Sequence, residues 1–165
     1  MTQKSQATQA TQATQISVTV TVAAPVEKAF TVFTERFGTW WPYSHHLGDS
    51  DLDTAVLEPR VGGRWYERTT DGAECDWGTV LAWDPPGHVA MSWHIGPTWE
   101  AVDDPALASR VDVRFVAETA GRTTVTLTHS ELDRHGEGWE SLRDSVGDTD
   151  GWARILESFT AVAGT

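Results

Sequence analysis

The fold is decided by the stretch 151–162 near the C-terminus, which reads GWARILESFTAV. Its large apolar residues recur at helical spacing and share one face: Trp152, Ile155, Leu156, Phe159 and Val162. A shorter helical pattern precedes it over 139–146, and Gly147 separates the two. A helix with one apolar face has to bury that face against another element, so this stretch predicts a sheet elsewhere in the chain.

That sheet is predicted by period-two patterns along the chain. Residues 16–22 alternate Ile or Val with Ser or Thr, as in a half-buried strand. A helix is expected to open at Ala24-Pro25 and to end at Gly38. Six further strands are expected over 53–58, 64–69, 74–83, 88–94, 111–115 and 124–128. The order strand, helix, six strands, helix predicts a two-layer α+β domain.

The chain is expected to form one domain over residues 16–165, because 165 residues suit a single core. Residues 1–15 repeat Gln-Ala-Thr and hold nothing that could anchor a core. This composition predicts a disordered tail or an added leader.

Composition excludes several classes of function. The chain has 24 acidic and 12 basic residues, a formal charge of −12, so binding to nucleic acid or to an anionic membrane is not expected. A single cysteine, Cys75, rules out a disulfide within the chain. Neither a membrane-spanning apolar run nor a signal peptide is found, and a cytoplasmic location is expected.

Several short motifs resemble those of the START-like superfamily, whose helix-grip fold is that of the birch pollen allergen. They are Ala24-Pro25, Trp40-Trp41-Pro42, Gly62-Gly63-Arg64-Trp65, Trp77-Gly78, Trp83-Asp84-Pro85-Pro86, Trp93, His129 and Gly151-Trp152. Within the superfamily the chain is most similar, over residues 16–162, to the branch named after the activator of the heat-shock-protein-90 ATPase. The resemblance implies a curved antiparallel sheet of about seven strands that grips the long C-terminal helix.

The same resemblance implies an internal cavity, a small apolar or aromatic ligand, and a monomer or homodimer. The name of the branch implies a chaperone as a further partner, although no counterpart of the N-terminal docking domain of such cochaperones is expected from these 165 residues. Three hypotheses follow: a ligand-binding protein, a cyclase- or hydrolase-like enzyme, and a protein that regulates a chaperone.

Nine tryptophans are unusual for a chain of this length. Indoles supply large apolar area, so they can form an ordinary core or the wall of a ligand cavity. The residues predicted to bind ligand are Trp41, Trp65, Trp77, Trp93, His129 and Trp152. The loop 95–108, which contains Trp99, is expected to cover the opening.

Three residues are candidates for acid–base chemistry. His129 shares strand parity with Val125 and Leu127, so it is expected to face inward near the cavity mouth. Glu58 and Glu67 are candidate carboxylates, and Glu67 lines the cavity if Trp65 does. The preferred alternative has Trp65 and Glu67 facing outward, because ion pairs within a sheet outnumber catalytic carboxylates. Arg64, Tyr66 and Arg68 would then face inward or pair across the sheet.

Known catalytic and metal motifs are not found. His45 and His46 are adjacent, so on an extended segment their side chains point apart and cannot easily share a metal. The chain has neither a Gly-x-Ser-x-Gly elbow nor a glycine-rich phosphate loop. No metal and no cofactor are therefore expected.

Overall fold

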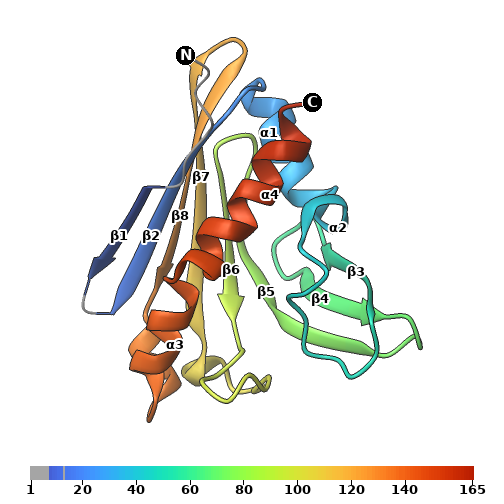
Figure 1. Ribbon diagram of the computed structural model, residues 1–165, viewed down its shortest axis with the longest axis vertical. Helices are drawn as coiled ribbons and strands as arrows, with labels where there is room; N and C mark the ends of the chain where they lie inside the picture. The colour runs from blue at the N-terminus through green and yellow to red at the C-terminus, as the bar shows by residue number, and fades with distance from the viewer. Residues whose placement is uncertain (1–7, 13) are drawn as a thin grey trace.

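The protein is a curved antiparallel sheet with helices on its concave face (Figure 1). The computed structural model describes residues 8–12 and 14–165. The strands are β1 (Thr8–Gln12), β2 (Gln15–Val22), β3 (Leu52–Leu57), β4 (Arg64–Thr69), β5 (Glu74–Asp84), β6 (His88–Trp93), β7 (Ser109–Thr119) and β8 (Arg122–Ser130). They pair in the order β1-β2-β8-β7-β6-β5-β4-β3. The predicted α+β helix-grip architecture is confirmed.

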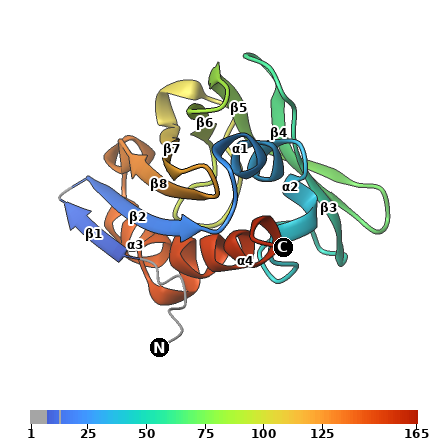
Figure 2. The same cartoon turned by 90° about the horizontal axis from the view of Figure 1, so that it is seen from above.

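Helices cover one face of this sheet. They are α1 (Val26–Thr34), α2 (Phe37–Trp40), α3 (Trp139–Val146) and α4 (Arg154–Ala163), with 3-10 turns η1 (Pro105–Leu107) and η2 (Leu132–His135) and a π-helical turn η3 (Thr149–Ala153). Figure 1 shows α4 running diagonally from α3 to the C-terminus beside α1, and Figure 2 shows the sheet wrapping around it. Phe159 on α4 packs against Phe33 of α1 with ring centroids 5.3 Å apart.

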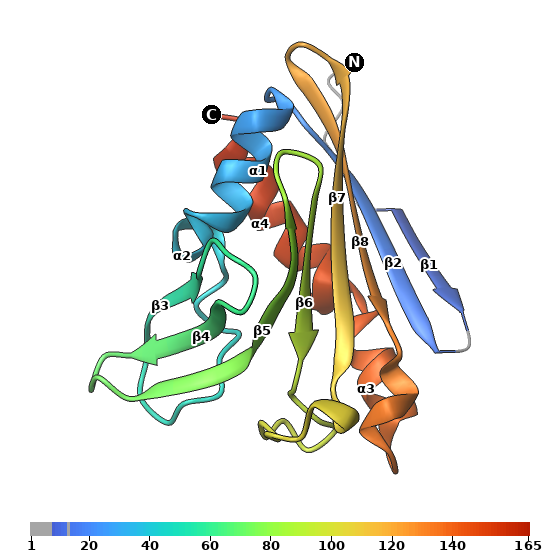
Figure 3. The same cartoon turned by 180° about the vertical axis from the view of Figure 1, so that it is seen from behind.

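The long strand β5 joins two parts of the sheet. It pairs with β6 along one stretch and with β4 along the other, with register shifts in both ladders. Figure 3 shows the β3–β4 hairpin turned away from the direction of β6, β7 and β8. Such bulges bend a strand and increase its twist, so β5 curls the sheet around the helices.

The strands with clean alternation bury the residues that the sequence predicts. In β2 and β8 every second residue is buried, and Val18 lies opposite Leu127, which in turn lies opposite Val113 of β7. Three apolar side chains thus stand side by side on the concave face. β-Branched residues suit such a pleated, half-buried surface.

Two expectations from the sequence need correction. Disorder over residues 1–15 is wrong for Thr8–Gln12, which forms β1 against β2, because the exposed edge of β2 offers free backbone groups that a Thr-containing segment can pair with. Residues 1–7 and 13 of that prediction lie outside the described residues. Gly38 does not end the first helix but lies inside α2, where a Cβ would stand 2.3 Å from Thr54 Oγ1. It allows α2 to approach β3 closely.

Candidate functional site

The site is a cavity of about 420 Å³ between the sheet and the break in the C-terminal helix. Ordinary ligand pockets enclose about 300–1,000 Å³. Its apolar lining consists of Trp41, Leu47, Trp77, Trp93, Ile95, Trp99, Val146, Trp152 and Ile155. Its polar lining consists of Ser44, His45, His46, Ser145, Asp148 and Asp150, with Gly151 between the two sets.

The break between α3 and α4 brings part of the polar lining to the cavity. Gly147 donates its N–H to the carbonyl of Arg143 and ends α3. Gly151 then has non-helical torsions inside η3, and a Cβ there would stand 2.3 Å from the carbonyl of Val146. Only a glycine fits so close to that backbone, so the chain can turn here and place Asp148, Asp150 and Trp152 on the cavity.

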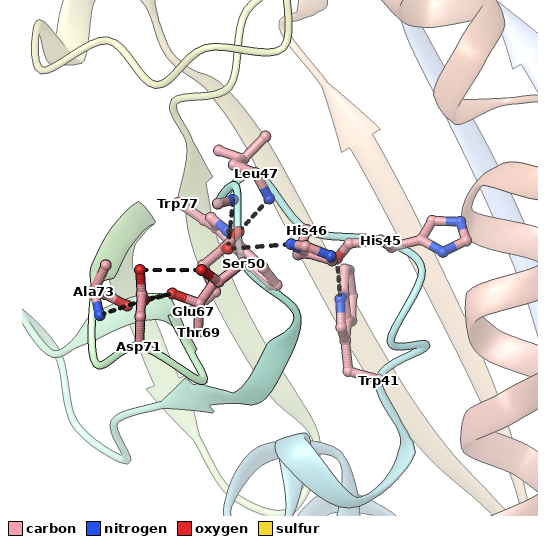
Figure 4. A network of polar contacts seen from close by, with 11 residues as sticks. Trp41, His45, His46, Leu47, Ser50, Glu67, Thr69, Asp71, Ala73 and Trp77 are labelled. Carbon is pink, nitrogen blue, oxygen red and sulfur yellow. Dashed lines mark hydrogen bonds and ion pairs between the residues drawn. The ribbon is translucent and has the colours of Figure 1, made fainter.

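Four buried indoles form the wall, and each N–H is bonded within the protein. Trp41 Nε1 donates to the carbonyl of His45 at 2.7 Å, and Trp93 Nε1 donates to the carbonyl of Ile95 at 2.8 Å. Trp77 Nε1 donates to Glu67 Oε1 at 2.9 Å (Figure 4), and Trp152 Nε1 donates to His129 Nδ1 at 3.1 Å. The wall therefore offers a ligand apolar ring surface and no unpaired indole donor.

The indoles also pack against one another. Trp41 and Trp77 lie with ring centroids 4.8 Å apart, and Trp93 and Trp152 lie 5.5 Å apart. Paired aromatic rings at these distances gain about 0.5–1.5 kcal/mol beyond their buried area. Each ring is thus held both by its neighbours and by its N–H, which gives a preorganised surface.

Trp65 is not part of this wall. Its side chain is fully buried and lies behind the wall, 5.5 Å from Trp77 and 5.7 Å from Trp93 between ring centroids. Its Nε1 is buried and finds no hydrogen-bond partner among the described residues. The prediction that Trp65 contacts ligand is not supported by this position, whereas Trp41, Trp77, Trp93 and Trp152 do line the cavity.

Trp99 lies on the predicted covering loop. It lines the cavity while 47% of its surface stays exposed, and its φ of 63° is unusual for a residue with a side chain. A turn holds it, because Trp99 N–H donates to the carbonyl of Gly96 and Gly96 N–H donates to that of Glu100. This indole forms the exposed rim of the cavity.

His129 faces inward, as its parity predicts, but lies behind the wall instead of at the mouth. It is fully buried, and its ring lies 5.1 Å from that of Trp93. Because an indole N–H only donates, Nδ1 of His129 accepts from Trp152 and the ring proton sits on Nε2. Nε2–H then donates to Ser109 Oγ at 2.7 Å.

The hydrogen bonds continue from Ser109 to a second histidine. The Ser109 hydroxyl, which donates to the carbonyl of Trp93 at 3.4 Å, also contacts Nε2 of His135 at 2.7 Å. Burial lowers the pKa of His129 to about 3, with a smaller contribution from His135. Burial likewise lowers the pKa of His135 to about 4, helped by His94. Both rings stay neutral at neutral pH, and the proposed shuttle role of His129 loses its geometric basis.

Glu67 is buried, contrary to the preferred alternative. Its carboxylate accepts three hydrogen bonds, from Leu47 N–H at 2.6 Å, Gly48 N–H at 2.9 Å and the Trp77 indole (Figure 4). These donors compensate the cost of burying a charge, which the sequence pattern could not reveal. Trp65 shares this inward face of β4.

The arginines of β4 do form the expected ion pairs, but on the outer face. Arg64 Nη2 lies 2.7 Å from Asp76 and 3.1 Å from Glu74, and Arg68 Nε lies 3.7 Å from Asp53. Their preference for solvent leaves the opposite face of the strand to Trp65 and Glu67.

Glu58 has a structural place away from the cavity. Its carboxylate accepts from the backbone N–H of Arg64 at 2.7 Å and contacts Arg60 at 3.2 Å, so it braces the turn between β3 and β4. It does not line the cavity. The candidate pairing of His129 with Glu58 or Glu67 as acid and base is therefore not brought together.

Two further kinds of reactive group concern the free cysteine and clusters of metal-ligating side chains. Burial raises the pKa of the Cys75 thiol, which disfavours a thiolate nucleophile. Within residues 8–12 and 14–165, no three His, Cys, Asp or Glu side chains are arranged to hold a metal ion. None of the helices in that part of the chain has the length and apolarity to span a membrane.

The residues that sequence reasoning missed are the polar ones at the mouth. His45 Nε2 contacts the carbonyl of Asp150 at 2.9 Å, and its Nδ1 lies 2.9 Å from Ser44 Oγ. His46 lines the cavity beside it. The signal in the sequence is the adjacent pair His45-His46, separated from Trp40-Trp41-Pro42 by Tyr43-Ser44, and that pair suggests only a test for metal binding.

Comparison with known proteins gives the family. The sequence profile of the family described as activator of Hsp90 ATPase homolog 1-like protein matches residues 23–164. The chain belongs to this family. The START-like resemblance is thereby confirmed. No match was found among curated proteins.

Two solved structures are informative in sequence as well as in fold. The anthrahydroquino-γ-pyrone synthase Txn09, solved in a complex, is 40% identical, with 92% of this chain and 97% of that chain covered and a TM-score of 0.65. The self-sacrificing resistance protein CalC from Micromonospora echinospora is 28% identical, with 91% and 94% covered and a TM-score of 0.64. Protein NE0264 from Nitrosomonas europaea, at 15% identity over 91% and 94% with a TM-score of 0.64, shares the fold.

Proposed function

We propose that this family member binds a planar, fused-ring aromatic molecule in the tryptophan-walled cavity. The observation that carries the proposal is that all four buried wall indoles have their N–H groups bonded inside the protein. Flat apolar rings can stack on such a wall. Because the indole N–H groups of the wall are already bonded within the protein, a bound ligand does not leave any of them without an acceptor.

The polar lining of the cavity suits substituents of such a molecule. Ser44, His45 and His46 come from the loop after α2, and Asp148 and Asp150 come from the helix break. Two carboxylates at the mouth, on a chain with a formal charge of −12, disfavour ligands that carry fixed negative charges. The proposed ligand is therefore neutral or cationic, with hydroxyl or carbonyl groups at its edge.

The similarity to Txn09 supports the same ligand class. The name of that protein describes a synthase for an anthrahydroquinone fused to a γ-pyrone, which is a flat polycyclic molecule with hydroxyl groups. At 40% identity over nearly the whole of both chains, a related ligand shape is a reasonable expectation for this cavity.

Binding is tested by titrating the tryptophan fluorescence with alizarin, a dihydroxyanthraquinone. Saturable quenching is expected, and Trp99→Ala should weaken binding about tenfold because a stacked indole contributes roughly 1–3 kcal/mol. Tyr43→Ala is the matched control, since Tyr43 is an exposed aromatic residue that does not line the cavity. Absence of saturable quenching, or equal weakening by both variants, contradicts the proposal.

Ring-forming chemistry on the bound molecule is a second candidate, favoured by the synthase similarity. It requires an acid–base group that reaches the ligand, and His129 and Glu58 are too far from the cavity surface for that role. The test is whether a linear hydroxyanthraquinone precursor is converted into a cyclised product of the same mass, which liquid chromatography separates and mass spectrometry identifies. Recovery of the unchanged precursor under saturating protein rejects this candidate.

Regulation of a chaperone ATPase has only the family description in its favour. An unchanged ATPase rate of the chaperone in the presence of this protein would reject it. Cytoplasmic location and a monomeric or dimeric state stay predictions, which cell fractionation and sedimentation can check.

A further inference from the structure

His46 occupies a special position in the cavity lining. It follows the wall residue Trp41 on the same loop, and about one fifth of its side chain is exposed. Its Nδ1 is buried and has no hydrogen-bond partner among the described residues. The nearest carboxylate is that of Glu67, whose Oε2 lies 3.8 Å from this nitrogen (Figure 4).

Glu67 fixes both the position and the charge of this pair. The two backbone N–H groups that it accepts belong to Leu47 and Gly48, the residues directly after His46. The carboxylate thus clamps the loop that carries the histidine, and the Trp77 indole fixes its Oε1 in turn. A buried carboxylate beside an imidazole orients the ring.

The tautomer of His46 follows from this contact. A negative charge facing Nδ1 favours a proton on that nitrogen, which leaves the lone pair on Nε2 for a ligand. A distance of 3.8 Å is longer than a hydrogen bond, but such contacts between catalytic groups often shorten when ligand binds. The arrangement is that of a carboxylate-oriented general base.

Building on the proposed function, we infer that His46, positioned by Glu67, takes the proton of a phenolic hydroxyl on the bound aromatic molecule. The O–H bond of the phenol breaks, its electron pair stays on oxygen, and the proton forms a bond to Nε2 of His46. The products are a phenolate and an imidazolium whose Nδ1–H faces Glu67. No oxidant, reductant or metal enters this step.

The other charged groups around the cavity do not replace His46. His45 has both ring nitrogens engaged, with Ser44 Oγ and with the carbonyl of Asp150. Asp148 and Asp150 also line the cavity, and their negative charges oppose a phenolate. The positive charge that stabilises the phenolate is therefore assigned to the imidazolium of His46.

The test uses alizarin, whose visible absorption changes when its phenol loses a proton. The absorption of the dye is titrated against pH when free and when bound to the intact protein. Binding is followed separately by tryptophan fluorescence. We expect the acid dissociation constant of the dye to rise at least tenfold on binding. His46→Gln should abolish this rise, while the fluorescence titration at a pH where the phenol stays protonated still shows saturable binding of the neutral dye.

His88→Gln is the matched control. His88 also faces a carboxylate, with Nε2 2.8 Å from Asp112 Oδ1, but it does not line the cavity. This variant should keep the full rise. Glu67→Gln, with its fold verified by circular dichroism, should reduce the rise because it removes the charge behind Nδ1 while keeping an acceptor oxygen.

The outcomes separate the two proposals. Quenching by alizarin with an unchanged dissociation constant, or with a rise that survives His46→Gln, overturns the role of His46 and leaves the binding function standing. No quenching in the wild-type protein overturns the binding function and with it the role of His46.

Discussion

Two histidines next to the same cavity have opposite surroundings. His129 lies behind the tryptophan wall, is fully buried, and has both ring nitrogens in hydrogen bonds of 3.1 and 2.7 Å. His46 lies in the cavity lining, is partly exposed, and has a buried Nδ1 that finds no hydrogen-bond partner among the described residues and lies 3.8 Å from the Glu67 carboxylate. A buried histidine whose two ring nitrogens are both hydrogen-bonded maintains structure. A histidine at a cavity surface with a ring nitrogen that lacks such a partner can exchange a proton with a ligand.

The largest expected effect concerns Glu67, which anchors the His46 side of this comparison. Glu67→Leu leaves three N–H donors without an acceptor, and each such loss costs roughly 1–3 kcal/mol. We expect the free energy of unfolding to fall by about 4 kcal/mol, measured by urea denaturation. Glu58→Leu is the control and should cost about 1 kcal/mol, because Glu58 braces an exposed turn. Equal losses would contradict the account.

The next effect concerns the pH dependence of stability on the His129 side. Well above pH 6.5, His129 is neutral in both the folded and the unfolded protein. Below it the unfolded state binds a proton that the folded state excludes until pH approaches 3, so stability falls as pH falls. The expected slope from His129 approaches about 1.4 kcal/mol per pH unit between pH 6 and 4. His129→Gln should lose this share of the slope, and an unchanged slope would show that His129 is not held neutral.

A smaller effect separates two buried indoles. Trp152→Phe removes the donor of His129 Nδ1 and leaves that nitrogen buried without a partner. Trp65→Phe removes the same volume but also an N–H that has no partner among the described residues. We expect Trp152→Phe to cost about 2 kcal/mol more than Trp65→Phe in thermal or urea unfolding. The reverse order would mean that the Trp152–His129 hydrogen bond contributes nothing.

The smallest effect concerns His46 itself. Because its side chain makes no hydrogen bond with the described residues and is partly exposed, His46→Gln should change the free energy of unfolding by less than about 0.5 kcal/mol. Differential scanning calorimetry of both proteins at neutral pH measures this. A loss as large as that of Trp152→Phe would assign His46 to structure and not to the ligand.

The sequence predicts the fold well where one physical signal dominates. Alternating Val and Thr define β2 and β8, and the apolar stripe defines α4, because burial of one face decides both patterns. The preferred prediction for β4, with Trp65 and Glu67 facing outward, is wrong. Glu67 can be buried because Leu47, Gly48 and Trp77, from elsewhere in the chain, donate hydrogen bonds to its carboxylate. No local pattern reveals such distant partners.

The candidate site shows the same limit. Trp41, Trp77, Trp93 and Trp152 line the cavity as expected, but Trp65 and His129 stand one layer behind it. Strand parity tells which face a side chain occupies and not how deep it lies. His46 was missed because its role depends on Glu67, which lies 21 residues further along the chain on β4 and comes within 3.8 Å only in the folded protein.

The central claim is that a flat aromatic ligand stacks on indoles whose N–H groups stay bonded to the protein. Indole ¹⁵N–¹H spectra recorded with and without alizarin test it most directly. The account predicts shifted resonances for Trp41, Trp77, Trp93 and Trp152, all still protected from hydrogen exchange, and unchanged resonances for Trp83 and Trp139, which lie outside the cavity lining. Unshifted wall resonances, or shifts confined to Trp83 and Trp139, would contradict it.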